Sequence, residues 1–258
     1  MERVELFGLP FISAPDHGGV VREVLAWPQP PAKPDELPLL STPNVDQVVK
    51  LHRPENAALL KQVARARFVL PDGQPIVWVS RWANGGALPA RLAGSDLFPA
   101  LWKLLAKKQT PVFMVLAQEA IGTFLQRENP AMRYMVPPFY SIAETKAENA
   151  VVQAVYEQLM ERPVSLVFLG LGFPKQERLA LALVDRLKEA GAPLPLFLLL
   201  GASFEFHAGL KKRAPRIWQR LGLEFFHRFL SEPRRMFRRY FVDDLQFFRL
   251  AWKELRRS

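Results

Sequence analysis

Short apolar runs alternate with longer amphipathic segments through most of the chain. The runs have strand length and comprise residues 38–42, 67–70, 111–117, 164–172 and 195–203. The segments between them, such as 94–108 and 174–191, carry apolar residues at helical spacing. Apolar strands alternating with amphipathic helices are typical of βαβ units on a parallel sheet. The pattern predicts an α/β fold, a Rossmann-like open parallel sheet with helices on both faces.

Two regions depart from this alternation. Residues 28–38 contain five prolines and are expected to form an extended surface connection. After Gly209 the strand-like runs stop, and residues 213–258 predict two or three helices separated by Gly222 and Pro233. We therefore expect an α/β domain over residues 1–210, followed by a helical segment over residues 211–258.

The composition, 49% hydrophobic and 23% charged, is that of a globular protein. No apolar stretch reaches the roughly 18 residues of a membrane-spanning helix. The first residues, MERVELFGLP, include acidic side chains and lack the features of a signal peptide. The absence of cysteine excludes disulfides, thiol nucleophiles and cysteine metal sites, and favours a cytoplasmic protein.

The net charge of +10 is concentrated at the end of the chain. Residues 211–258 hold 14 Lys/Arg and 5 Asp/Glu, whereas the preceding residues hold 21 and 20. A cationic segment on a nearly neutral body indicates an anionic partner: a membrane surface, a nucleic acid or a phosphorylated substrate.

A basic amphipathic helix is expected over about residues 234–255. Its apolar stripe comprises Phe237, Phe241, Leu245, Phe248, Trp252 and Leu255. Such a helix can dock on the core with a solvated basic face. Its aromatic density and one-sided charge also match helices that lie on an anionic membrane.

Four stretches follow apolar runs with combinations of small, polar and charged residues, namely 41–44, 70–75, 170–177 and 201–209. Ligands of open parallel sheets bind beyond the carboxyl ends of the strands, so these stretches predict the site. Asp72 has two interpretations there. Pro-Asp-Gly is a common turn sequence, and a carboxylate beyond a strand end can also act as a general base.

The other candidates are less specific. Gly170 and Gly172 would allow a phosphate to approach the backbone, but Lys175 stands where a dinucleotide-binding fingerprint needs its third glycine. Lys175 at a helix start suggests an anionic ligand, whereas Glu177 there suits the helix dipole in any protein. The sequence has no Asp-x-Asp, no P-loop and no histidines at metal-ligand spacing. No metal and no cofactor are therefore expected, and arginines would neutralise a diphosphate.

Six motifs in fixed order carry a family resemblance. They are T-P-N at 42–44, P-D-G-x-P at 71–75, R-x-x-G-S-D-L at 91–97, G-x-G-x-P-K-Q-E at 170–177, G-A-S-F-E-F-x-A-G…K-R-A-P at 201–215, and L-G-L-E-F-F-x-R-F-L-x-E-P-R-R-x-x-R-R at 221–239. Together they resemble the WecG/TagA/CpsF glycosyltransferases, glycosyltransferase family 26, over about residues 38–242.

The resemblance implies an inverting, metal-independent transfer of a hexose from a UDP-sugar, often UDP-N-acetylmannosamine. The implied acceptor is a polyprenyl-diphosphate-linked saccharide at the inner face of the plasma membrane, in cell-surface polysaccharide biosynthesis. Asp72 corresponds to the family's proposed general base. The implied substrate-binding residues are Thr42, Asn44, Arg91, Lys175 and Gln176, with the tail arginines Arg228, Arg235 and Arg238 reaching the diphosphate.

Two other classes of function remain as alternatives. A nucleic-acid-binding protein could use the basic aromatic tail, but it would leave the strand-end residues unexplained, and the nearly neutral body offers no basic groove. A non-catalytic relative could act as a scaffold, although Asp72, Thr42, Asn44 and Gln176 are all present. A peripheral transferase on the anionic inner membrane surface is therefore favoured, without nucleic acid as a partner. A homo-oligomer is left open.

Overall fold

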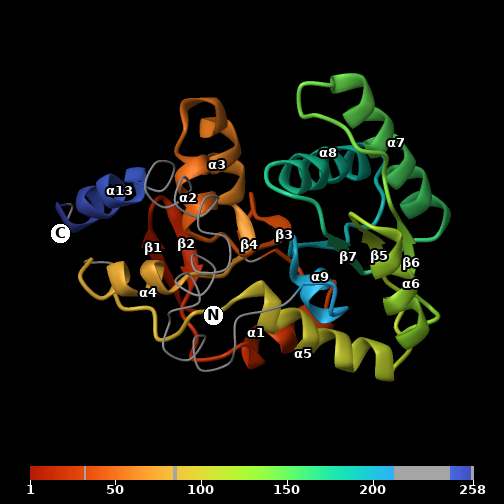
Figure 1. Ribbon diagram of the computed structural model, residues 1–258, viewed down its shortest axis with the longest axis horizontal. Helices are drawn as coiled ribbons and strands as arrows, with labels where there is room; N and C mark the ends of the chain where they lie inside the picture. Colours follow the sequence, from red (N-terminus) through yellow and green to blue (C-terminus); the bar gives the residue numbers. More distant parts are fainter. Residues whose placement is uncertain (32, 84–85, 212–244, 257–258) are drawn as a thin grey trace.

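The computed structural model describes residues 1–31, 33–83, 86–211 and 245–256 (Figure 1). The strands are β1 (Arg3–Leu6), β2 (Leu9–Ile12), β3 (Leu37–Ser41), β4 (Ala66–Val69), β5 (Phe113–Val115), β6 (Arg133–Met135), β7 (Leu166–Leu169) and β8 (Leu196–Leu199). The helices are α1 (Gly18–Leu25), α2 (Val45–Leu51), the short 3-10 helix η1 (Pro54–Asn56), α3 (Ala57–Val63), α4 (Gln74–Ser80), α5 (Gly94–Lys107), α6 (Glu119–Glu128), α7 (Thr145–Glu161), α8 (Lys175–Glu189), α9 (Ser203–His207) and α13 (Leu245–Arg256).

The eight strands of the described residues form one sheet in the order β1-β2-β4-β3-β8-β7-β5-β6. Every neighbouring pair is parallel except β1 and β2, which form an antiparallel hairpin at one edge. The α/β fold predicted from the sequence, with an open and mostly parallel sheet, is therefore confirmed.

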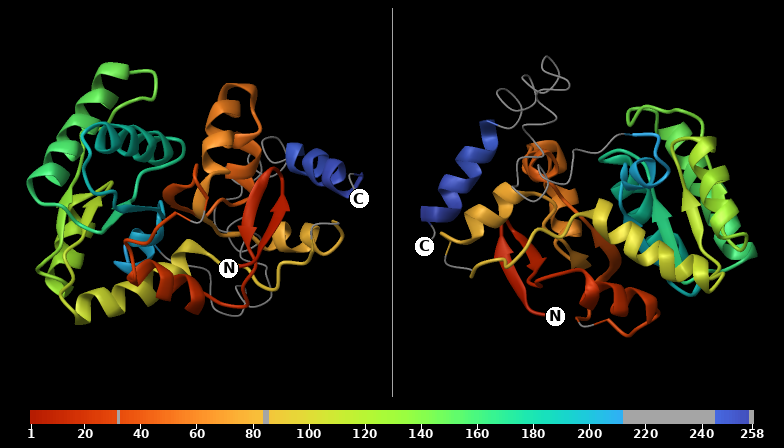
Figure 2. Two further views of the ribbon diagram at one scale, coloured as in Figure 1. Left: turned by 180° about the vertical axis from the view of Figure 1, so that it is seen from behind. Right: turned by 60° about the horizontal axis from the view of Figure 1, so that its bottom comes forward.

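Helices cover both faces of this sheet (Figures 1 and 2). Residues of α2, α3, α4, α7, α8 and α13 contribute to the core on one face. Residues of α1, α5, α6 and α9 contribute to the core on the other. Successive strand residues alternate between the two cores, as Phe68 and Val69 of β4 do. The central strands are thus apolar on both sides, which explains their continuous hydrophobic runs.

The N-terminal hairpin was not predicted from the sequence. Phe7 and Gly8 connect its strands, and both have positive φ (54° and 65°), the conformation of a tight two-residue hairpin turn. Phe7 is buried although it stands at the turn, because its ring contacts Phe247 of α13 with centroids 5.3 Å apart. The beginning and the end of the chain therefore pack together.

Two further segments needed the structure for their assignment. Residues 74–80, an apolar run after Asp72, form helix α4, with Pro75 in its first turn, where a missing N–H costs nothing. Part of the stretch 201–209 forms the short helix α9.

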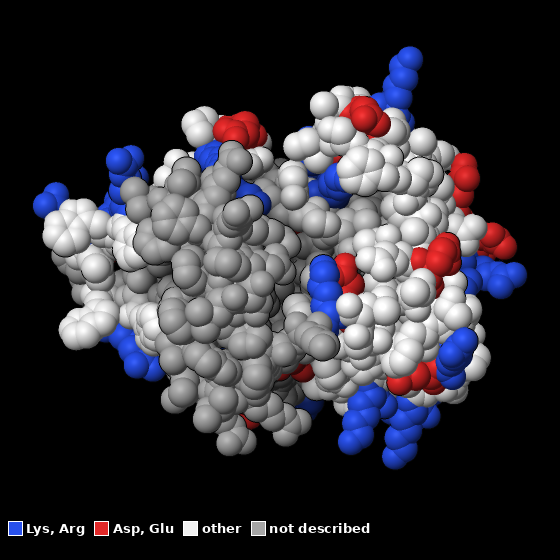
Figure 3. Space-filling view, viewed as in Figure 1, with Lys and Arg blue, Asp and Glu red and all other residues white. Residues whose placement is uncertain are grey.

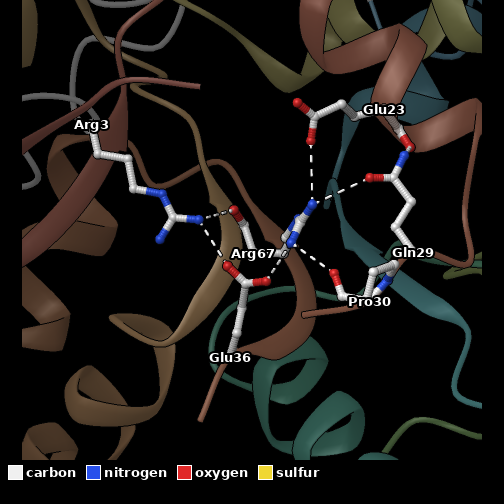
Figure 4. Close-up of polar contacts among 6 residues, drawn as sticks. All are labelled: Arg3, Glu23, Gln29, Pro30, Glu36 and Arg67. Atoms are coloured by element: carbon white, nitrogen blue, oxygen red, sulfur yellow. Dashed lines mark hydrogen bonds and ion pairs between the residues drawn. The ribbon is translucent and has the colours of Figure 1, made fainter. Parts of the chain in front are cut away.

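The Pro-rich segment is attached to the amino ends of β3 and β4 (Figure 4). Arg67 of β4 donates to Glu36 (2.7 Å) and to the backbone oxygen of Pro30 (3.3 Å), and Arg3 donates to the other oxygen of Glu36 (2.8 Å). The Glu36 side chain is only 3% exposed, so both guanidinium groups are needed to offset the cost of burying its charge. This network lies at the opposite end of the strands from the predicted site.

Helix α13 is docked on the body through a face that the sequence did not single out. Phe247 and Ala251 are buried, and Leu250 packs beside them. Phe248 and Trp252, members of the predicted stripe, are 70% and 58% exposed. Phe237 and Phe241 lie outside the described residues. The docked face is therefore one residue away from the predicted stripe, and the division of the chain at residue 210 stays a prediction.

None of the described helices has the length and apolar character that crossing a bilayer requires.

Candidate active site

The four sequence stretches predicted to carry the site follow four adjacent strands. The stretches at 41–44, 70–75, 170–177 and 201–209 follow β3, β4, β7 and β8, which are neighbours in the order β4-β3-β8-β7. Because these strands are parallel, their carboxyl ends meet at one edge of the sheet. The helices that follow begin at this edge, so their positive amino ends favour an anionic ligand there.

Thr42 and Ser203 flank the beginning of α5. A Cβ atom built on Gly94 would lie 2.9 Å from the Thr42 hydroxyl oxygen and 3.2 Å from that of Ser203. Both side chains are buried, and the Ser203 hydroxyl donates to the Leu200 carbonyl (2.7 Å). Glycine at position 94 therefore lets the α5 backbone approach two hydroxyls that come from different strand ends. Gly94 and Ser203 belong to two different sequence motifs, at 91–97 and 201–215. Nothing in either motif indicated that the two residues would be in contact.

Asp72 lies on a half-buried connection held by its neighbours on both sides. Its N–H donates to the Pro43 carbonyl (3.3 Å), and the N–H of Leu92 donates to the Pro71 carbonyl (2.9 Å). Gly73 has φ 176°, an extended conformation, so the segment leads from β4 into α4 without the positive φ of a Pro-Asp-Gly turn. Asp72 thus stands beyond a strand end, beside the segments that carry Thr42 and Arg91.

Arg91 and His17 both contact the beginning of α5. Arg91 forms an ion pair with Asp96 of α5 (3.4 Å between Nη2 and Oδ2). His17, for which the sequence suggested no role, has its Nε2 3.1 Å from the Ala93 carbonyl oxygen. Burial lowers the pKa of His17, opposed by the charge of Asp96. This histidine thus fastens the start of α1 to the start of α5.

Asn44 is the N-cap of α2. Its side-chain oxygen accepts from the Gln47 N–H (3.1 Å), and the Gln47 side chain accepts from the Asn44 N–H (3.0 Å), which completes a capping box. Lys175 also has protein partners: its ammonium donates to the Tyr140 carbonyl and lies over the rings of Phe139 and Tyr140. Both residues stand at the predicted edge and contribute to its local structure.

Gln176 joins two of the strand ends. Its side-chain oxygen accepts from the Gly201 N–H (3.1 Å), and its amide donates to Glu177 Oε1 (3.0 Å). Glu177 is the third residue of α8, where a glutamate usually reaches back to the N-cap N–H. Here the N-cap is Pro174, which has no N–H. The Glu177 carboxyl turns to Gln176 instead.

Glu177 is a buried carboxyl group with a raised pKa. Its side chain is buried at 2% exposure, and Oε2 has no hydrogen-bond partner among the described residues. Burial raises the pKa to about 7, opposed by the hydrogen bond from Gln176. The helix dipole accounts for a glutamate at this position, but the local sequence gave no sign of its burial.

The remaining predicted site residues lie outside the described part. Arg228, Arg235 and Arg238 fall between residues 212 and 244. Of the residues that the structure describes, no three His, Asp or Glu side chains are grouped as a metal site would need.

The arrangement suits the transfer of a group from an anionic donor. Asp72 supplies a carboxylate that can accept a proton, and the buried hydroxyls of Thr42 and Ser203 lie beside the amino end of α5. A comparison with protein families agrees with this chemistry: the model of the glycosyl transferase WecG/TagA/CpsF family matches residues 4–258.

Replacement of Gly94 by alanine tests the contact between the strand ends. The new methyl group would press on Thr42 and Ser203, and such overpacking costs about 1–3 kcal/mol, more than the gain in helix propensity of at most about 1 kcal/mol. The free energy of unfolding, measured in urea, should fall. Gly172→Ala is the control, because a Cβ there meets nothing within 4 Å. Equal stability of both variants would contradict the close approach.

Glu177 should make stability depend on pH. Its pKa rises from 4.5 to about 7 on folding, so the folded protein keeps a proton that the unfolded chain releases between these values. Its contribution to stability therefore falls as pH rises through this window, by on the order of 3 kcal/mol, and is constant above it. Glu177→Gln, which cannot ionise, should gain stability relative to the parent between about pH 5 and about pH 8. Parallel pH profiles of the two proteins would contradict a raised pKa of Glu177.

Proposed function

The chain belongs to the WecG/TagA/CpsF family of glycosyl transferases, and from this premise we propose that it transfers a hexose of the N-acetylmannosamine type from a UDP-sugar to a polyprenyl-diphosphate-linked saccharide. The family places the chain among the glycosyltransferases of cell-surface polysaccharide biosynthesis. The observation that carries the proposal is the position of Asp72, on a half-buried strand-to-helix connection beside the Thr42 and Arg91 segments.

The proposed reaction is a single displacement with inversion. The acceptor hydroxyl oxygen bonds to the anomeric carbon of the donor while the bond to the UDP oxygen breaks, and UDP leaves with the bonding electrons. Asp72 takes the proton of the attacking hydroxyl. Thr42 and the start of α5 face the donor, and Arg91 together with Gln176 keeps the loops around it in place.

The leaving diphosphate needs positive charge. The amino ends of α5 and α8 supply partial charge at the edge of the sheet. We assign the remainder to Lys175 and to the tail arginines Arg228, Arg235 and Arg238, because guanidinium groups bind phosphates in pairs of hydrogen bonds. The basic segment 211–258 would also hold the enzyme at the anionic inner face of the plasma membrane, where its lipid-linked acceptor resides.

Removal of the Asp72 charge tests the base. Asp72→Asn keeps the size of the side chain, so the variant should fold, and turnover should fall by about 10²–10⁴-fold. The assay incubates the protein with a panel of UDP-hexoses and a lipid-diphosphate-linked saccharide and identifies the product by mass spectrometry. Full turnover in a folded variant would leave Asp72 a purely structural residue. No transfer by the parent from any donor would refute the proposed substrates.

The arginine hypothesis makes a separate prediction about divalent cations. If protein cations neutralise the diphosphate, transfer should continue at its full rate in excess EDTA. The control is a metal-dependent glycosyltransferase assayed in the same buffer. Loss of activity in EDTA that Mg²⁺ or Mn²⁺ restores would show that a metal performs this task.

A further inference from the structure

Two helices at one end of the molecule each expose a pair of aromatic side chains. Trp78 of α4 and Trp82 just beyond it are exposed, Trp82 by 78%, and Phe248 and Trp252 of α13 form the second pair. The members of each pair are four residues apart, one helical turn, so both lie on the same face. Backbone hydrogen bonds from Arg81 to Trp78 and from Trp82 to Val79 continue the α4 turn to residue 82.

Neither pair can turn inward, because both helices are already docked through their other faces. Ile76, Val77 and Ser80 of α4 are buried, and so are Phe247 and Ala251 of α13. Large apolar side chains held in water are unfavourable, and contiguous ones usually mark an interaction surface.

The two pairs belong to one region of the molecule. In the views of Figures 1 and 2 the C-terminal end of α13 lies beside α4, next to the β1–β2 hairpin. Residues of both helices pack on the same core as the hairpin. We call the four exposed side chains Trp78, Trp82, Phe248 and Trp252 the α4–α13 aromatic surface.

Basic residues surround this surface. Arg81, Arg249, Lys253 and Arg256 are exposed, and the Arg256 guanidinium lies over the Trp252 ring (4.8 Å). Within residues 74–83 and 245–256 the only acidic residue is Glu254, which is half-buried. Among the coloured residues in Figure 3, Lys and Arg side chains edge this end of the molecule, and no Asp or Glu does.

We propose that the α4–α13 aromatic surface binds an anionic phospholipid bilayer, with tryptophans of α4 as a second anchor beside the basic C-terminal helix. Tryptophan prefers the boundary between lipid tails and headgroups, and the flanking cations attract anionic headgroups. A second copy of the chain is a poorer partner for this surface, because a symmetric contact would bring the basic residues of one copy against those of the other.

This surface also orients the active site, an inference that rests on the proposed function. Helix α4 begins two residues after Asp72, and Trp78 stands four residues into it, a rise of about 6 Å. Binding of α4 to the bilayer would therefore hold the proposed base close to the headgroups. A saccharide attached through a diphosphate to a membrane lipid lies at that level.

The absence of cysteine allows a direct test in the full-length chain. An environment-sensitive dye is attached to the thiol of a Trp82→Cys variant. The matched control is the same dye on a Leu104→Cys variant, at an exposed position on α5. On addition of vesicles of phosphatidylglycerol and phosphatidylcholine, the dye at position 82 should brighten several-fold and shift to the blue, and the dye at 104 should not change. A silent dye at position 82 on vesicle-bound protein would overturn the proposal. The proposal would also be overturned if the dye fluorescence at position 82 changed with protein concentration in the absence of lipid, because this would indicate that a second copy of the chain covers the surface.

A second measurement separates this proposal from the proposed function. Trp82→Ser should weaken binding to the same vesicles about tenfold and slow transfer to a long-chain acceptor in them, while transfer to a water-soluble short-chain acceptor is unchanged. Leu104→Ser, the control, should match the parent in vesicle binding and in transfer to both acceptors. If the parent transferred no sugar in any assay, the proposed substrates would be refuted. The vesicle-binding measurement would then still test whether the α4–α13 aromatic surface binds lipid. Vesicle binding by Trp82→Ser equal to the parent's would exclude α4 as an anchor.

Discussion

β3 is hydrogen-bonded in parallel to β4 on one side and to β8 on the other. The carboxyl ends of neighbouring parallel strands lie at the same edge of the sheet. The connections that carry Thr42, Asp72 and Ser203 therefore lie side by side. Leu39 and Leu40 pack into opposite cores, and a slip by one residue would exchange these faces. The burial of β3 on both sides therefore fixes its register, and the register places the site.

Several side chains at this edge hold the connections in place. Asn44 caps α2, and Gln176 ties Gly201 to the buried carboxyl of Glu177. A substrate that bonds to either of them would have to replace a contact that already exists. Such residues can shape the site even where they do not touch the substrate, because they hold the connections that follow the strands in place.

The two ends of the chain share one anchoring point. Phe7, at the turn of the β1–β2 hairpin, is covered by Phe247 of α13, so the docked face of the last helix is set by a residue from the beginning of the sequence. Helix α13 also contacts α2, and these contacts together leave one face of α13 outside. Phe248 and Trp252 of α13 stay exposed, and the C-terminal end of α13 lies beside α4, the helix that starts just after Asp72. Both helices that carry the surface pack on the same core as β3 and β4, the strands that lead to Thr42 and Asp72.

The α/β class, the central strands and the four stretches at the edge of the sheet followed from the sequence, because periodicity and chain order are local properties. The hairpin and α4 were not assigned, since short apolar segments fit several structures. Only tertiary packing decided the burial of Glu177, the contact of Gly94 with Thr42 and Ser203, and the docked face of α13. Each depends on segments far apart in the chain, and a local pattern carries no information about which distant side chain will fill the space beside it.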